Sequence, residues 1–241
     1  MLQATLWGAF AGSSILLGAL LGIFKDIPRK ITAAIMSFGT GILLGAAAFE
    51  LLDEALHNGG MTATSFGFIC GALLFTISEL IITKGGGHHR KRSTMNPDNH
   101  SGLSIFIGTV IDAIPESIII GVSLLDQGSV SYLMVIAVFI SNFPEGLSSS
   151  VGLIKDGYSK KKIIIMWFIV VLLASLSSLL GFSLLSNASS MVISFIGAFA
   201  AGGIVAMVSS TMMPEAFEEG GAIVGFTASI GLLCSLILSS L

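Results

Sequence analysis

Apolar runs long enough to cross a lipid bilayer, about 20 residues each, recur from one end of this chain to the other. Only 10% of its 241 residues are charged. An ordinary soluble domain has roughly a quarter of its residues charged, so a soluble globular fold is excluded. We expect an all-α integral membrane protein, because helices satisfy their own backbone hydrogen bonds in lipid.

Short polar segments divide the apolar runs and predict eight transmembrane helices. The expected spans are 4–24, 31–52, 62–83, 102–124, 130–154, 163–185, 190–213 and 221–240. Together they predict a single transmembrane domain over residues 1–241, with no room for a sizeable domain outside the membrane.

All 11 lysine and arginine residues fall in three of the polar segments, 25–30, 84–102 and 155–162. These segments follow the first, third and fifth spans, so they lie on the same side of the membrane. The positive-inside rule places that side in the cytoplasm and both termini outside it. The chain offers no basic surface for nucleic acid.

The segment between the third and fourth spans, residues 84–101, is expected to be a flexible cytoplasmic loop. It carries His88, His89 and His100 among glycine, lysine and arginine residues. Histidine-rich tracts bind metals such as zinc, whereas the neighbouring cations would repel a metal ion. The loop is therefore either a solvated linker or a weak, exchangeable metal-binding tract.

Two segments in the fourth and fifth spans repeat each other. Residues 111–125 and 140–154 align without gaps, and each contains a Pro-Glu pair. The two spans run in opposite directions, and inverted repeats of this kind mark the midplane site of many transporters. Pro115 and Pro144 each remove a backbone hydrogen bond, so we expect a kink at the centre of both helices.

A weaker match links the second and seventh spans. Residues 37–55 and 198–216 share small residues followed by an acidic residue and alanine, at an offset of 161. This favours a 3+2+3 organisation, in which spans 1–3 and 6–8 are inverted partners around the central pair.

Four oxygen-bearing side chains lie on the repeated segments. Asp112 and Glu116 are four residues apart, and Asn142 and Glu145 are three apart, so each pair shares a helix face. We expect all four to converge where the two segments pack together. Oxygen ligands of this kind suit a divalent metal ion.

The acidic residues of the two segments have no lysine or arginine within the spans to neutralise them. A charged side chain at the bilayer centre costs at least about 2.5–3.5 kcal/mol. The carboxyl groups are therefore either protonated and hydrogen-bonded at two structural kinks, or they hold a cation. The inverted pairing favours the cation.

At these residues the chain resembles the ZIP family of divalent-metal transporters, whose fourth and fifth spans carry a His-Asn-x-Pro-Glu-Gly type pattern. The matching segments here are DAIPES (112–117) and SNFPEG (141–146). The resemblance implies eight spans, both termini outside, and movement of zinc, iron or manganese toward the cytoplasm. It also implies that Asp112, Glu116, Asn142 and Glu145 form the metal site.

This chain departs from the family pattern at three positions: Asp112 replaces the usual histidine, Ala113 the usual asparagine, and Ser141 the usual histidine or glutamine. Many members hold a second metal with a carboxylate from the sixth span, but residues 163–185 contain no acid, so we expect one site. An all-oxygen ligand set favours harder ions, whereas the family favours zinc and iron. The ion stays open among zinc, iron and manganese.

Further polar residues mark an expected pathway. Glu50 and Asp53, with Glu54 and His57, cluster at the outer end of the second span and predict an acidic vestibule that concentrates cations. Their alternative role is that of a solvated helix end. On the cytoplasmic side, the ion would leave past Glu215, which could instead cap a helix. We also place Ser141, His88 and His89 on this pathway.

These observations predict a metal carrier of the plasma membrane that works by alternating access. It would need no cofactor, since the divalent metal is its substrate, and its other partners would be membrane lipid and, in a homodimer, a second copy. A membrane metal sensor without transport is the alternative. An intramembrane hydrolase is disfavoured because neither Pro-Glu segment offers a histidine base, so we expect no enzyme.

Overall fold

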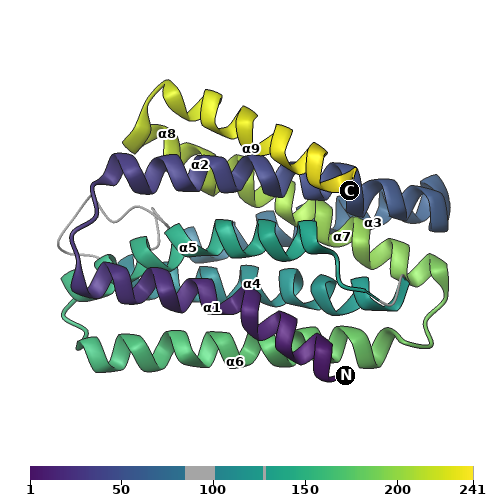
Figure 1. Ribbon diagram of the computed structural model, residues 1–241, viewed down its shortest axis with the longest axis horizontal. Coiled ribbons are helices and arrows are strands. Elements are labelled where there is room, and N and C mark those ends of the chain that lie inside the picture. The colour runs from purple at the N-terminus through teal and green to yellow at the C-terminus, as the bar shows by residue number, and fades with distance from the viewer. Residues whose placement is uncertain (85–100, 127–128, 241) are drawn as a thin grey trace.

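A computed structural model describes residues 1–240 apart from 85–100 and 127–128, and every regular element in these ranges is helical (Figure 1). Two short π-helical segments, η1 and η2, continue α2 and α7. The elements are α1 (Leu2–Phe24), α2 (Arg29–Ala46), η1 (Ala47–Leu52), α3 (Asp53–Lys84), α4 (Ser101–Asp126), α5 (Tyr132–Lys155), α6 (Lys160–Leu185), α7 (Ser190–Met207), η2 (Val208–Met212), α8 (Met213–Gly220) and α9 (Ile223–Ser239).

Six of the described helices are long and apolar enough to cross a membrane. Two of the six, Arg29–Ile82 and Ser190–Gly220, each combine α-helices with a π-helical segment. Ile223–Ser239 is a further, shorter apolar helix. Large apolar side chains such as Leu184 and Phe226 stand exposed on the helices, as expected for a surface that faces lipid rather than water. The predicted all-α integral membrane architecture is confirmed.

Gly60 interrupts the stretch Arg29–Ile82. Its φ of 73° and ψ of 172° are non-helical and belong to a region that essentially only glycine adopts. Leu51 lies against Gly197 of α7, and Gly71 lies against Phe199, only two residues further along α7. A straight helix from Leu51 to Gly71 would have advanced by about 30 Å, so the chain doubles back at Gly60.

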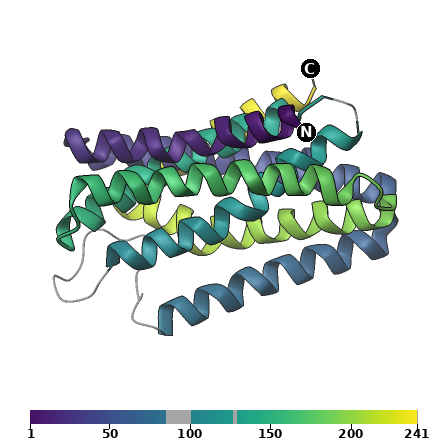
Figure 2. The same cartoon turned by 90° about the horizontal axis from the view of Figure 1, so that it is seen from below.

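The helices pack in two groups. One consists of α1, α4, α5 and α6, and the other of α2, α3, α7, α8 and α9. The two groups meet mainly where α2 packs on α5, with smaller contacts of α4 with α7 and α3. Figure 2 shows α3 along the edge of the second group, away from α1. The carboxyl-bearing helices α4 and α5 therefore both lie where the groups meet.

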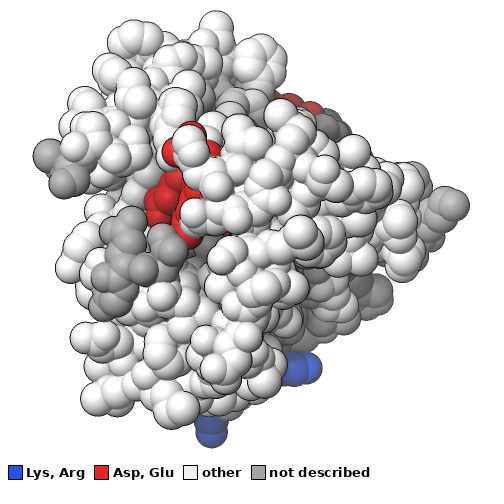
Figure 3. Space-filling model, turned by 90° about the vertical axis from the view of Figure 1, so that its right-hand side faces the viewer, with Lys and Arg blue, Asp and Glu red and all other residues white. Residues whose placement is uncertain are grey.

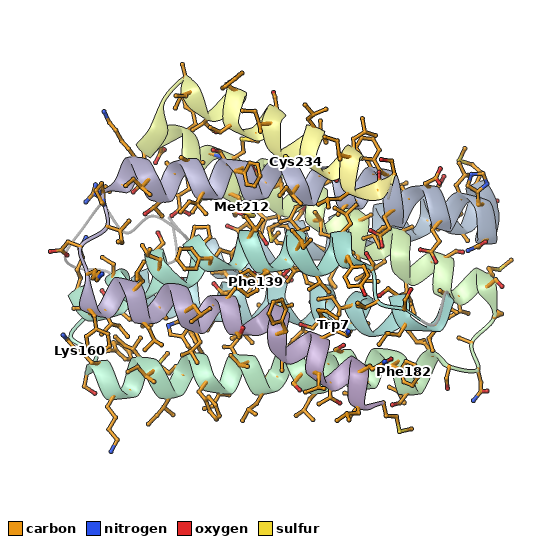
Figure 4. All side chains as sticks on the ribbon, in the orientation of Figure 1. Trp7, Phe139, Lys160, Phe182, Met212 and Cys234 are labelled. Carbon is orange, nitrogen blue, oxygen red and sulfur yellow. The ribbon has the colours of Figure 1, made fainter. Side chains whose placement is uncertain are left out.

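The two ends of the bundle differ in charge. The α1–α2, α5–α6 and α8–α9 connections lie at the left of Figure 1, and the α6–α7 connection lies at the right, toward which both termini point. Lys160 lies at the left end, whereas Trp7 lies toward the right (Figure 4). Trp7 packs edge-on against Tyr132 there, with ring centroids 5.9 Å apart. We call these the basic end and the aromatic end.

The structure corrects the expected extent of two polar segments. Residues 53–59 and 214–220 were expected to connect spans, but they are helical and prolong α2 and α7 through the π-helical segments. Both segments are rich in glutamate, alanine or leucine, which are strong helix formers. The helices therefore run past the point where the apolar pattern stops. Pro115 and Pro144 lie inside helices that continue on both sides.

Candidate metal centre

Helix α4 supplies two of the predicted ligands. Asp112 and Glu116 lie on consecutive turns, three residues before and one residue after Pro115, and they are only 6% and 3% exposed. Both residues take part in hydrogen-bonding or electrostatic interactions with their surroundings. Burial of two acids on one helix face is costly unless such contacts or a cation compensate for it.

Asp112 and Glu116 border a small pocket that is partly open at the side of the bundle, where the exposed Leu74 lines it. It has a volume of about 60 Å³, and Ser78 of α3 and Met207 of α7 complete its polar and sulfur-bearing lining. The remaining walls are apolar, and none of the residues around the chamber is a lysine or an arginine. We call this space the carboxylate chamber. It lies between α3, α4 and α7, where the two helix groups meet.

Helix α5 supplies the other two predicted ligands. Ser131 caps the start of this helix by accepting a hydrogen bond from the Met134 amide. Further along this helix, Asn142 and Glu145 are each 2% exposed. Ser141 is fully buried, and its hydroxyl donates to the Val138 carbonyl at 3.1 Å, which commits its proton to its own helix.

The four predicted ligands lie in two pairs, one on α4 and one on α5. Helices α4 and α5 are in contact, but nowhere in the described part of the chain do three His, Cys, Asp or Glu side chains form a group that could hold a metal ion. Glu116 and Glu145 are both buried, and each takes part in hydrogen-bonding or electrostatic interactions with its surroundings. Two carboxyl groups of α4 and one of α5 are therefore buried on helices that contact each other, and in the described part of the chain they do not form a three-residue metal-binding group.

The aromatic end carries an acidic hollow, which is visible in Figure 3 as the acidic side chains gathered at its centre. Glu50 and Glu54 line a pocket of about 30 Å³ together with Ser123 of α4 and Ser194 of α7. Glu50 also shares a hydrogen bond with Ser131. The three serines were not anticipated, because nothing in the sequence links them to the second span.

Asp53 does not belong to this hollow. Its side chain is 62% exposed and pairs with His57 of the next turn at 3.6 Å. Of the four residues of the expected vestibule, Glu50 and Glu54 line the pocket, whereas Asp53 and His57 lie outside it. The π-helical turn η1 accounts for this, because it changes the rotation between Glu50 and the residues that follow.

Glu215 lies buried near the basic end. It is 4% exposed, and its Oε1 accepts a hydrogen bond from Ser148 of α5 at 3.0 Å. Ser148 also lines a cavity of about 250 Å³ that contains Asp26, Lys155 and Glu219. We call this space the basic-end cavity. Ser148 was missed from the sequence, although it lies three residues after Glu145 and so on the same helix face.

His88 and His89 belong to residues 85–100, which lie outside the described part of the chain. The proposed histidine tract therefore stays a prediction.

Comparison with known proteins gives two matches. Residues 82–238 match the family model described as "ZIP Zinc transporter". The chain is also 26% identical over 206 residues to a protein of Arabidopsis thaliana named "Putative zinc transporter At3g08650", an alignment that covers 84% of this chain and 33% of that protein. The chain thus spans about a third of the length of this curated relative.

Proposed function

The chain belongs to the ZIP zinc transporter family, and from this premise we propose that it carries divalent metal ions across a membrane. One observation in particular supports the proposal: Asp112, Glu116 and Glu145 are buried on α4 and α5, two membrane-spanning helices that contact each other. Buried acids in a membrane span are costly, and they typically mark ion pathways.

We place the metal site at Asp112, Glu116, Asn142 and Glu145. Since the described side chains lie in pairs, we propose that the ion completes the site by attracting carboxylates of both helices. The closely spaced oxygen atoms would then replace part of the water shell of the ion. The absence of an acid in residues 163–185 supports a single site.

The substrate is proposed to be zinc, iron or manganese. The name of the Arabidopsis relative supports zinc. The ligand atoms are all oxygen, and Asp112 stands where the family pattern has a nitrogen ligand, which supports the harder ions iron and manganese.

A pathway through the protein is supported by the two spaces on either side of this site. The Glu50–Glu54 hollow opens at the aromatic end, and the basic-end cavity adjoins Glu215 and Ser148. We propose that an ion arrives through the hollow, binds at the central carboxylates and leaves past Glu215. We propose that the protein lies in the plasma membrane with its basic end in the cytoplasm, as the positive-inside rule predicts. Both termini are then outside the cell, and movement of the ion from the aromatic end to the basic end is uptake.

The chain reversal at Gly60 supports eight membrane crossings, because it divides Arg29–Ile82 into two antiparallel helices. Helix α9 (Ile223–Ser239) supplies the last crossing. We propose that the eight helices form a 3+2+3 inverted repeat.

Matching contacts support this repeat. The π-helices begin at Ala47 and Val208, which are 161 residues apart, the same offset as in the sequence match. Glycines without room for a Cβ also recur in corresponding places. Gly71 meets the Phe199 carbonyl as Gly231 meets that of Phe38, and Gly202 meets the Phe68 carbonyl as Gly41 meets that of Ala228. Inverted repeats give a carrier two states of similar energy, open to opposite sides.

The proposal is tested by uptake of Zn²⁺, Fe²⁺ and Mn²⁺ into liposomes that contain the purified protein and a metal-sensitive dye. We expect Glu116→Gln and Glu145→Gln to abolish uptake of every metal. Glu218→Gln, on an exposed residue near the basic end, is the matched control and should retain it. Uptake at the original rate in both central variants would overturn the site.

The same assay separates transport from sensing. A sensor would bind the metal ions to the purified protein but would give no flux into the liposomes. Binding that requires Glu116 without any flux would replace the carrier with a receptor.

A further inference from the structure

A groove without polar side chains lies between α4, α6 and α7. Its volume is about 450 Å³, and its walls include Pro115 and Ile118 of α4, Leu180 and Leu184 of α6, and Phe195 of α7. Only aliphatic, aromatic, proline and glycine residues line it. The volume is well above the roughly 150 Å³ of a protein cavity that holds one benzene molecule.

The groove is open at the side of the bundle. Leu180 and Leu184 stand at its mouth with 51% and 74% of their surface exposed. The three helices that form it are all long and apolar enough to span the membrane. What faces the opening is therefore the hydrocarbon of the bilayer, and an apolar groove offers water no hydrogen bonds.

The position of the groove along the helices fits a lipid tail. One end lies at Leu184 and Leu185, the last residues of α6, next to the polar turn 186–189. The other end lies at Pro115, near the middle of α4. The groove thus runs from a helix end, where headgroups lie, toward the centre of the membrane.

The groove also shares a wall with the carboxylate chamber. Pro115, Phe199 and Ala200 line both spaces. On one side of this wall lie Asp112 and Glu116, and on the other side lies the lipid-facing groove. Whatever fills the groove therefore supports the helix segment that carries both carboxylates.

We propose that the groove binds one acyl chain of a membrane phospholipid, which packs behind Pro115 and Phe199 and closes the carboxylate chamber on its lipid side. The headgroup lies near the turn 186–189, at the aromatic end. The site depends on the membrane-spanning fold and not on transport, so it stands or falls separately from the proposed function.

The test uses the full-length protein in vesicles of phosphatidylcholine and phosphatidylglycerol. A phosphatidylcholine with a diazirine in the middle of one acyl chain is added in increasing amounts, activated by light and mapped by mass spectrometry. We expect labelling of α6 and α7 at the groove to saturate at low probe fractions. Labelling of the lipid-facing side of α9, around Leu233, should rise in proportion to the probe.

A matched pair of variants tests the site itself. Leu180→Trp puts a large side chain at the groove, and Leu233→Trp makes the same change on α9, where the leucine is similarly exposed at 56%. We expect Leu180→Trp to reduce labelling at Phe195 and Phe199 several-fold and Leu233→Trp to leave it unchanged. Should Leu180→Trp fail to fold, saturation of labelling on the unaltered protein shows whether the groove binds an acyl chain.

Two results would overturn the proposal. One is groove labelling that never saturates, which describes ordinary annular lipid. The other is a groove without lipid label whose residues cross-link to a second copy of the chain, which would make it an interface between protomers.

Discussion

Ser148 of α5 donates a hydrogen bond to the Oε1 atom of Glu215 on α8, with 3.0 Å between the two oxygen atoms. The bond joins the two helix groups, since α5 belongs to one and α8 to the other. It is made beside the basic-end cavity. One end of the proposed pathway is therefore held by a contact between groups that would have to move relative to each other in alternating access.

Ser148→Ala should weaken this contact. The carboxylate of Glu215 would lose a donor in a buried place, and we expect a loss of about 1 kcal/mol in stability, as for hydrogen bonds between membrane helices. A thermal melt in detergent measures the loss. Ser149→Ala is the matched control, because the Ser149 hydroxyl bonds to a carbonyl of its own helix. Equal melting temperatures for the two variants would contradict a specific role of Ser148.

The packing of α2 on α9 makes a sharper stability prediction. A Cβ at Gly231 would lie 2.2 Å from the Phe38 carbonyl oxygen, whereas a Cβ at Gly225, on the same helix, meets nothing within 4 Å. Gly231→Ala should therefore push the helices apart and destabilise the protein by about 1–3 kcal/mol. Gly225→Ala should be neutral or slightly stabilising, because alanine favours helix. Thermal melts of the two variants measure the difference, because the same substitution is made next to a neighbouring helix at Gly231 and in open space at Gly225.

Gly60 gives a prediction about backbone conformation. At φ 73° and ψ 172°, neither alanine nor asparagine is accommodated, although asparagine tolerates the ordinary left-handed region. Gly60→Ala and Gly60→Asn should each cost on the order of 1–3 kcal/mol. A melt in which Gly60→Asn is as stable as the unaltered protein would show that the residue adopts the ordinary left-handed conformation instead.

Much of this arrangement follows from local sequence, and some of it does not. The apolar runs predict α1, α5 and α6 to within a few residues, because burial in lipid depends on each segment's own composition. The Ser148–Glu215 contact joins residues 67 positions apart, so it depends on how α5 and α8 pack. The exclusion of Asp53 from the acidic hollow depends on a π-helical turn that no residue pattern announces.

The proposed metal ligands likewise have some features that local sequence predicts and others that depend on helix packing. The inverted Pro-Glu repeat predicts that Asp112, Glu116, Asn142 and Glu145 converge. The structure shows that all four are buried on two helices in contact, and their convergence stays a prediction. That Asp112 and Glu116 face Ser78 and Met207 across a chamber could not be predicted, because it requires the third and seventh spans to be adjacent to the fourth.

The acidic hollow at the aromatic end predicts a dependence on ionic strength. Glu50 and Glu54 raise the local concentration of cations, and salt screens this attraction. In liposome uptake, Glu54→Gln should raise the KM for the metal at low salt and should have a smaller effect at high salt, with little change in the maximal rate. Asp53→Asn, on the neighbouring exposed residue outside the pocket, is the control. An equal change in KM for both variants would mean that the general charge of this end, and not the hollow, attracts the ion.

Asp112 provides a prediction about metal preference. Asp112→His replaces an oxygen ligand by an imidazole nitrogen, which suits zinc better than manganese. We expect the ratio of Zn²⁺ to Mn²⁺ uptake to rise by roughly tenfold, equivalent to about 1.4 kcal/mol. Competition between the two metals in liposomes that contain the variant measures this ratio directly. Asp53→His introduces the same side chain at an exposed position and should leave it unchanged. If Asp112→His transports both metals with the original ratio, Asp112 does not contact the ion in the state that selects it, and the site would have to be built from Glu116, Asn142 and Glu145.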